Sequence, residues 1–271
     1  MSKALVTLSA MTLREADFQD RIKAASSAGF DGMGLRISDY WQARSQGWSD
    51  AGMKCLVADH GIRVTEVELL RSWSAGKGPE SSREEDDAFH IARLFGARCV
   101  NAGLPDATER IDLVKEYARL CRRASDSGLL VPLEFMPYGV ITSLSEANRI
   151  VEEADQPNGG LLIDTWHCHR TGVGASELAL LPPGRVVSVQ ICDARPAAHS
   201  DLRHEARHLR RMPGEGVADI IGALRALKGG TRVSGIAVEV MSDELDAMSP
   251  GTAARLAHEA AHRMLRDSEW N

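Results

Sequence analysis

The sequence predicts an α/β fold in which the whole chain, residues 1–271, forms a single (β/α)8 TIM barrel. Short stretches rich in Val, Leu and Ile recur eight times, as expected of parallel strands that are buried on both faces. A polar, amphipathic segment follows each stretch. The repeat of roughly 25–35 residues is typical of such a barrel, whose usual length is about 250 residues. A doubly wound open sheet is the alternative.

The predicted strands follow one another at regular intervals, at residues 4–10, 32–37, 62–70, 97–103, 129–136, 160–166, 186–194 and 235–241. The helical segments between them include residues 15–30, 82–97, 108–128 and 218–230. Several of these segments end at a glycine shortly before the next strand, which is a common helix stop. Because no linker, low-complexity tract or shift in composition divides the chain, one domain is expected.

The composition limits the classes of function. Hydrophobic residues make up 44% and charged residues 26% of the chain, as in soluble globular proteins. The formal net charge is -6 without a dense run of Lys and Arg, which argues against a nucleic-acid partner. Five scattered cysteines without a C-x-x-C pair suit reduced thiols. The first 13 residues are too weakly apolar for a signal peptide or membrane anchor, so a cytoplasmic protein is expected.

Seven of the eight predicted strands end in a polar or charged residue within apolar sequence. Catalytic side chains of a (β/α)8 barrel lie at the carboxyl ends of the strands, so the candidate site consists of Arg36, Glu68, Asn101, Glu134, Asp164, Gln190 and Glu239. One such residue alone is better explained as a strand end that meets solvent. Together, the three carboxylates and one amide of strands five to eight would converge and repel each other without a cation.

Glu134, Asp164, Gln190 and Glu239 are therefore predicted to bind a divalent metal ion. Oxygen ligands suit Mn²⁺ or Mg²⁺, with Co²⁺ or Zn²⁺ as alternatives. Such an ion stabilises the oxyanion that forms when a C–H proton next to a carbonyl leaves. Glu134 and Glu239 are the predicted catalytic residues that remove and return this proton. His167, three residues after Asp164, is expected to contact the substrate, as are the strand-end residues Arg36, Glu68 and Asn101.

The chain resembles the sugar phosphate isomerase/epimerase superfamily, also called xylose-isomerase-like barrels. The segments that carry this resemblance are "PLEFMP" (132–137), "LLIDTWH" (161–167), "VQICDA" (189–194), "RRMPGEG" (210–216) and "AVEVMSDEL" (237–245). The resemblance covers nearly the whole chain. It implies a metal held by the four residues named above and substrate contacts from His167 and Arg210. A guanidinium before a glycine-bearing turn also suits an anionic oxygen.

Gln190 departs from the ketose epimerases of this superfamily, which usually carry a histidine there. With the segment R-x-x-P-G-x-G it looks more like the dehydratase branch, which includes bacterial 3-dehydroshikimate dehydratases. "VELLRSW" (67–73), with Glu68 and Arg71, is faintly similar to that branch, whereas "MPYGVITS" (136–143) lacks the basic residues expected for a leaving group. The leading hypothesis is a metal-dependent isomerase or epimerase acting on a small polyhydroxylated carbonyl compound. A lyase acting on dehydroshikimate, a ketoinositol or a 3-keto-glycoside is the alternative.

Other functions were weighed against particular motifs. "HEARH" (204–208) fits the zinc-protease pattern H-E-x-x-H, but it lies among arginines and no third ligand follows at a familiar spacing. A basic lid segment over the barrel mouth and a solvated charged loop are the two remaining interpretations. A nuclease of the endonuclease IV type would need several histidine ligands and a basic surface. A catalytically silent partner subunit stays open, as do a homodimer and a homotetramer.

Overall fold

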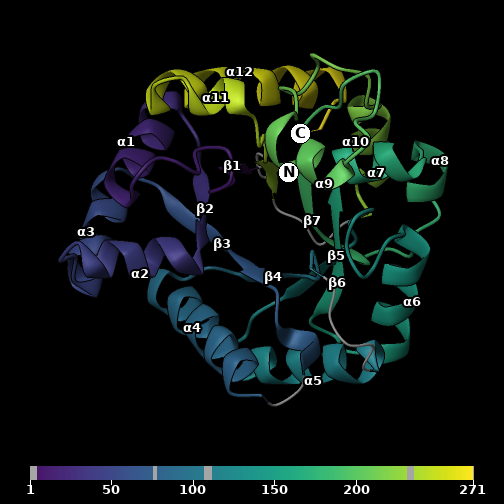
Figure 1. Cartoon of the computed structure of the whole chain (residues 1–271), viewed down its shortest axis with the longest axis horizontal. Helices are drawn as coiled ribbons and strands as arrows, with labels where there is room; N and C mark the ends of the chain where they lie inside the picture. Colours follow the sequence, from purple (N-terminus) through teal and green to yellow (C-terminus); the bar gives the residue numbers. More distant parts are fainter. Residues whose placement is uncertain (1–4, 76–77, 107–111, 231–234, 271) are drawn as a thin grey trace.

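The computed structural model of the protein describes residues 5–75, 78–106, 112–230 and 235–270. Eight parallel strands form a closed barrel in sequence order (Figure 1). These are β1 (Leu5–Leu8), β2 (Gly32–Arg36), β3 (Arg63–Leu70), β4 (Cys99–Gly103), β5 (Val131–Glu134), β6 (Gly159–Asp164), β7 (Val186–Ile191) and β8 (Gly235–Val238). Because β1 pairs with β8, the barrel prediction is confirmed and the open-sheet alternative is wrong.

The helices form an outer ring around the strands (Figure 1). They are α1 (Phe18–Ala28), α2 (Ile37–Ser45), α3 (Asp50–Asp59), α4 (Pro79–Phe95), α5 (Leu113–Ser125), α6 (Leu144–Ala154), α7 (Thr165–Thr171), α8 (Ala175–Leu178), α9 (Leu202–His208), α10 (Ile220–Leu227), α11 (Asp243–Asp246) and α12 (Pro250–Asp267), with a 3₁₀ turn at Trp73–Ala75. α12 packs against α1, which closes this ring. No helix in the described ranges is both long and apolar enough to cross a bilayer.

Several strands are shorter than the sequence predicted. The predicted strand 160–166 ends at Asp164 because the Asp164 side chain accepts hydrogen bonds from the backbone N–H groups of Trp166 and His167. This is the geometry of a helix N-cap, so α7 begins at once. β2 likewise gives way to α2 directly after Arg36. Side chains at these two strand ends thus sit where the chain turns out of the barrel.

The strand register brings the predicted site residues to one end of the barrel. Asp164 on β6 is paired with Gln190 on β7, and Gln190 is paired with Ala237 on β8, two residues before Glu239. Glu134 on β5 is paired with Gly103 on β4. Since all strands run in the same direction, their carboxyl ends meet on a single face.

A buried ion pair fixes α1 against α2 beneath this face. The Arg21 guanidinium is 1% exposed and donates to Asp39 Oδ2 at 2.5 Å and to the Leu13 and Ala16 carbonyls. Asp39 is also buried and accepts from Arg36. Two charges removed from water in this way are stable only as a pair.

Replacement of Asp39 by alanine should therefore strongly destabilise the fold. Arg21 would be left buried without its counter-ion, and the free energy of unfolding should fall by about 3–5 kcal/mol. Urea denaturation followed by circular dichroism measures this change. The control is Glu153→Ala, because Glu153 and Arg149 form an exposed pair whose loss should change stability by less than about 1 kcal/mol. Equal effects of the two substitutions would contradict the prediction.

Candidate active site

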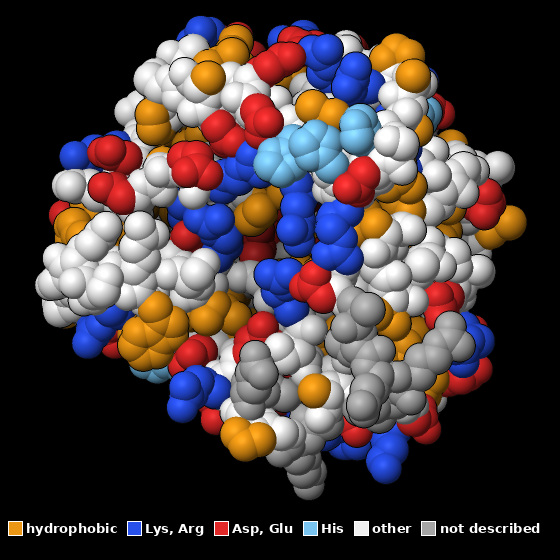
Figure 2. All heavy atoms as spheres, viewed as in Figure 1, with side chains coloured by type: hydrophobic (Ala, Val, Ile, Leu, Met, Phe, Trp, Pro, Cys, Tyr) orange, Lys and Arg blue, Asp and Glu red, His pale blue; other side chains and the backbone are white. Residues whose placement is uncertain are grey.

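A pocket of about 490 Å³ opens at the carboxyl ends of the strands. Figure 2 shows Lys and Arg side chains gathered around a hollow in this face. Eight of the nine predicted site residues line the pocket: Arg36, Glu68, Asn101, Glu134, His167, Gln190, Arg210 and Glu239. Asp164, the ninth, is fully buried beside them and contacts Arg210. The predicted strand-end residues are thus brought together.

Arg210 links two of the predicted metal ligands. Its Nη1 donates to Asp164 Oδ2 at 2.7 Å and to Glu239 Oε2 at 3.0 Å, and its Nε donates to the Ala206 carbonyl at 2.8 Å. Burial by itself would raise the pKa of Asp164. The Arg210 guanidinium, together with His167 and its backbone N–H, outweighs burial, so the pKa lies below its ordinary value. Burial raises the pKa of Glu239 well above its ordinary value. The two carboxyl groups that share one guanidinium therefore differ in proton affinity.

The loop after Arg210 is built around a buried aspartate at the end of β7. The Asp193 carboxylate accepts hydrogen bonds from the backbone N–H groups of Gly214, Ala218 and Ala194, at 2.8–2.9 Å. A Cβ on Gly216 would lie 2.2 Å from the Ala194 carbonyl oxygen, so only glycine fits there. The glycines of the R-x-x-P-G-x-G segment thus allow the loop to wrap closely around Asp193.

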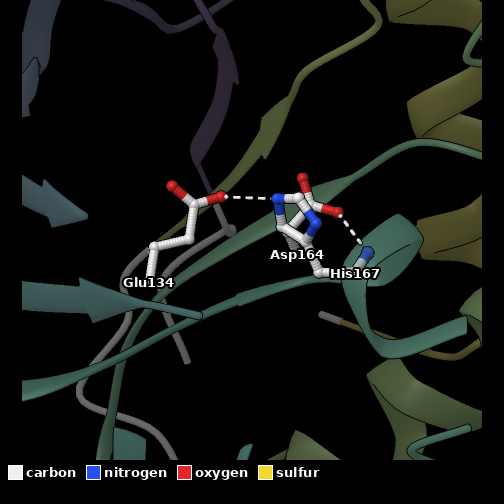
Figure 3. Close-up of side chains that lie close together, drawn as sticks. All are labelled: Glu134, Asp164 and His167. Atoms are coloured by element: carbon white, nitrogen blue, oxygen red, sulfur yellow. Dashed lines mark hydrogen bonds and ion pairs between the residues drawn. The ribbon is translucent and has the colours of Figure 1, made fainter. Parts of the chain in front are cut away.

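Glu134 and His167 face each other across the pocket floor, with Asp164 behind them (Figure 3). His167 Nε2 lies 3.1 Å from Glu134 Oε1, which is an ion-pair distance. The angles are not those of a hydrogen bond, so both ring nitrogens lack a hydrogen-bond partner within the described residues. Burial raises the pKa of Glu134 to about 8 and lowers the pKa of His167 to about 4. At neutral pH the metal-free site thus holds a protonated carboxyl beside a neutral imidazole.

The donor set fits a divalent cation. Within the described parts of the chain, Glu134, Asp164 and His167 form the one group of three or more His, Cys, Asp or Glu residues whose ligand atoms lie within 4.8 Å of one another. Gln190 adds a buried Oε1 without a hydrogen-bond partner among the described residues, while its Nε2 donates to Glu239 Oε1 at 3.2 Å. His167, which the sequence suggested only as a substrate contact, thus also lies within ligand range.

The three remaining predicted substrate contacts lie on the side of the pocket formed by β2, β3 and β4. Arg36 is held at the pocket edge by Asp39 and the Arg14 carbonyl. The Glu68 carboxyl fits in its place because residue 34 on β2 is a glycine. A Cβ on Gly34 would lie 1.9 Å from Glu68 Oε1. Asn101 donates to a buried carboxylate deeper in the barrel.

Sequence reasoning missed two buried residues that contact this side of the site, Ser9 and Glu66. The Ser9 hydroxyl lies 3.1 Å from Glu68 Oε2 and 3.2 Å from Glu239 Oε1, and so joins β3 to the end of β8. Glu66 accepts from Asn101 Nδ2 at 3.0 Å. Glu66 precedes Glu68 by two residues on β3, so the two share a face. The spacing of two residues between Glu66 and Glu68 was the feature of the sequence from which Glu66 could have been predicted.

Glu66 should make the stability of the metal-free protein depend on pH. Burial raises its pKa from 4.5 to about 7, so the folded state binds the proton more tightly than the unfolded state between these values. The resulting stabilisation is complete below pH 4.5 and is lost as pH rises through 7. Glu66→Gln cannot titrate, so at pH 8 the variant should be more stable than the parent by on the order of 1–3 kcal/mol.

Urea denaturation in EDTA between pH 4.5 and 8 measures this difference. The exposed Glu152→Gln is the matched control. Its free energy of unfolding should change with pH as that of the parent does. If the free energy of unfolding of Glu66→Gln changed with pH as steeply as that of the parent, the raised pKa of Glu66 would be refuted.

The HEARH segment is helical, as α9, and its glutamate points inward. Glu205 is fully buried, whereas the His204 and His208 rings stack with centroids 4.7 Å apart. The two histidines belong to no three-residue ligand group in the described ranges, so the zinc-protease interpretation has no structural support there. The solvated-loop interpretation is wrong, because the segment is helical, Glu205 and Ala206 are buried, and Arg207 lines the pocket.

The fold and the site define a class of protein, and sequence comparison agrees with it. Residues 22–267 match the family described as xylose isomerase-like TIM barrel. The chain belongs to this family.

Among curated proteins, the chain is similar to a 3-dehydroshikimate dehydratase of Pseudomonas aeruginosa, with 25% identity over 83% of the chain and 36% of the relative. The chain therefore spans about a third of the length of that dehydratase. An inosose isomerase of Bacillus velezensis is 24% identical over 81% of both chains. The solved structure of an IOLI protein with a bound zinc atom has a TM-score of 0.88 at 19% identity, over 97% of this chain and 99% of the other, which shows the shared fold.

Proposed function

We propose that the protein is a divalent-metal-dependent enzyme that removes a proton next to the carbonyl of a small polyhydroxylated compound, with isomerisation or epimerisation as the outcome. The observation that carries this proposal is that Glu134, Gln190 and Glu239 line one pocket and Asp164 is buried beside it. Among the described residues, Gln190 Oε1 has no hydrogen-bond partner. The enzymes named among its relatives, which include dehydratases and isomerases, support chemistry of this class.

In the proposed reaction, different residues of the chain have different roles. A divalent ion held by the four oxygen ligands would lower the pKa of the carboxyls and stabilise the oxyanion that develops on the substrate. Glu134 and Glu239 then exchange the proton with the substrate carbon. His167 stays neutral because of its burial and can hydrogen-bond a substrate hydroxyl or a proton in transit. Arg210 keeps Asp164 and Glu239 in place and offers charge to the enediolate oxygen.

Elimination of water after the same proton abstraction is the second candidate. Gln190, at a position where ketose epimerases usually carry histidine, and the similarity to 3-dehydroshikimate dehydratases favour it. Incubation with 3-dehydroshikimate, ketoinositols and 3-keto-glycosides separates the two outcomes. Loss of water extends the conjugation of the compound and changes its ultraviolet spectrum, whereas epimerisation leaves the conjugation unchanged and is detected by NMR of the product.

Glu239→Gln should abolish turnover while preserving the fold. The amide cannot accept the proton, so kcat should fall by about 10²–10⁴-fold, the usual contribution of a general acid or base. Steady-state kinetics on the best substrate of the panel measure the change. The control is Glu244→Gln, because Glu244 is 72% exposed and lies only five residues further along the chain. Activity retained in Glu239→Gln would exclude Glu239 from proton transfer.

Gln190→Leu should weaken metal binding. The substitution keeps the side-chain size but removes the amide oxygen, and the affinity for Mn²⁺ should fall at least about tenfold, or 1.4 kcal/mol. Isothermal titration of the metal-free protein with Mn²⁺ measures this without any substrate. Gln42→Leu, at an exposed position on α2, should bind as the parent does. Unchanged affinity in Gln190→Leu would remove Gln190 from the ligand set.

A further inference from the structure

The buried carboxylate of Glu205 joins three segments that the function proposed above does not explain. Its Oε1 accepts from Arg170 Nε at 2.9 Å and from the Trp166 indole N–H at 3.3 Å. Its Oε2 accepts from the backbone N–H of His199 at 2.7 Å. Glu205 therefore ties α9 both to α7 and to the segment after β7.

Trp166 connects this anchor with the active-site pocket. The guanidinium groups of Arg170 and Arg210 both lie over its indole ring, at 5.8 and 5.5 Å from the centroid. The Trp166 ring also meets the His167 ring edge-on at 5.3 Å. A cation over an aromatic face is attracted by the ring, so the position of the indole influences where Arg210 rests.

Arg210 is also attached to α9 directly. Its Nε donates to the carbonyl of Ala206, the residue after Glu205. A shift of α9 would therefore move this acceptor, and a shift of Trp166 would move the ring under the guanidinium. Both routes begin at Glu205. Both end at the side chain that bonds Asp164 and Glu239.

We propose that Glu205 is a positioning residue that fixes Arg210 and His167 in their active orientation by clamping α9 to α7 through Arg170 and Trp166. The inference rests on the proposed function for its catalytic consequence, but its structural content is independent of it. It also gives the glutamate of the H-E-x-x-H sequence a structural role: Glu205 is an internal anchor, and within the described residues the donors to its carboxylate do not include the side chains of His204 or His208. Glu205 touches neither the substrate pocket nor the predicted metal ligands.

Glu205→Gln tests the proposal with a readout that reports Arg210 itself. In ¹⁵N-labelled protein the Nε–H of Arg210 is identified by its absence from the spectrum of Arg210→Lys. Because Arg210 is buried and bonded to Ala206, this proton should exchange slowly with solvent in the parent. In Glu205→Gln its exchange should accelerate at least about tenfold. Glu153→Gln, on the exposed surface of α6, should leave it unchanged.

Turnover supplies the second readout. Glu205→Gln should lower kcat about 10–100-fold. In a double-mutant cycle, Glu205→Gln should lower the kcat of the Arg210→Lys variant by no more than about twofold. An unchanged Arg210 signal in Glu205→Gln, or fully independent effects of the two substitutions on kcat, would overturn the proposal. If no ketone is turned over, the proposed function fails, and the exchange measurement still decides the role of Glu205.

A second variant, Trp166→Phe, tests the proposal if Glu205→Gln folds poorly. Trp166→Phe leaves the Arg170–Glu205 ion pair in place but removes the indole donor to Glu205. Exchange of the Arg210 Nε–H should again accelerate, by less than in Glu205→Gln. Slow exchange identical to that of the parent would refute the clamp.

Discussion

The candidate active-site pocket depends on the buried Arg210 guanidinium, which is held between the carboxyl groups of Asp164 and Glu239. Carboxylates removed from water are stable only beside positive charge or as protonated acids, and the site uses both solutions. Arg210 keeps the pKa of Asp164 low, whereas burial raises the pKa of Glu134 and of Glu239. The site therefore combines one carboxylate that stays ionised, Asp164, with two carboxyl groups that bind a proton more readily, Glu134 and Glu239.

The barrel provides this arrangement through the side chains that end its strands. Asp164 and Asp193 close neighbouring strands, and each accepts backbone N–H groups of the segment that follows. Each carboxylate thus determines where the chain leaves the barrel. Asp164 then presents its second oxygen to Arg210, and the turn around Asp193 sets the course of the loop that carries Arg210. The same residues therefore support the loops and position the groups of the candidate site. A substitution of either aspartate is expected to affect both the local fold and the site.

The sequence predicted the barrel and the assembly of strand-end residues because both follow from periodicity: continuous apolar runs mark the strands, and parallel strands end on one face. It did not predict Glu66, because that residue lies within a strand, or Ser9, which meets Glu239 from 230 positions away. It gave Glu205 no role, since a motif specifies which residues are near in the chain and not which of them face the core. The metal ligand set stays a prediction.

Whether the proposed proton abstraction would be followed by elimination depends on the groups that surround the leaving hydroxyl. Residues 136–143 carry no Lys or Arg, which by itself disfavours a dehydratase. The pocket, however, is lined by Arg71, Arg83 and Arg207 from three other segments, and burial raises the pKa of Glu68 to about 8, so that this acid is protonated at neutral pH. Acids and cations that one segment lacks are thus supplied across the barrel mouth. The composition of that segment no longer weighs against elimination.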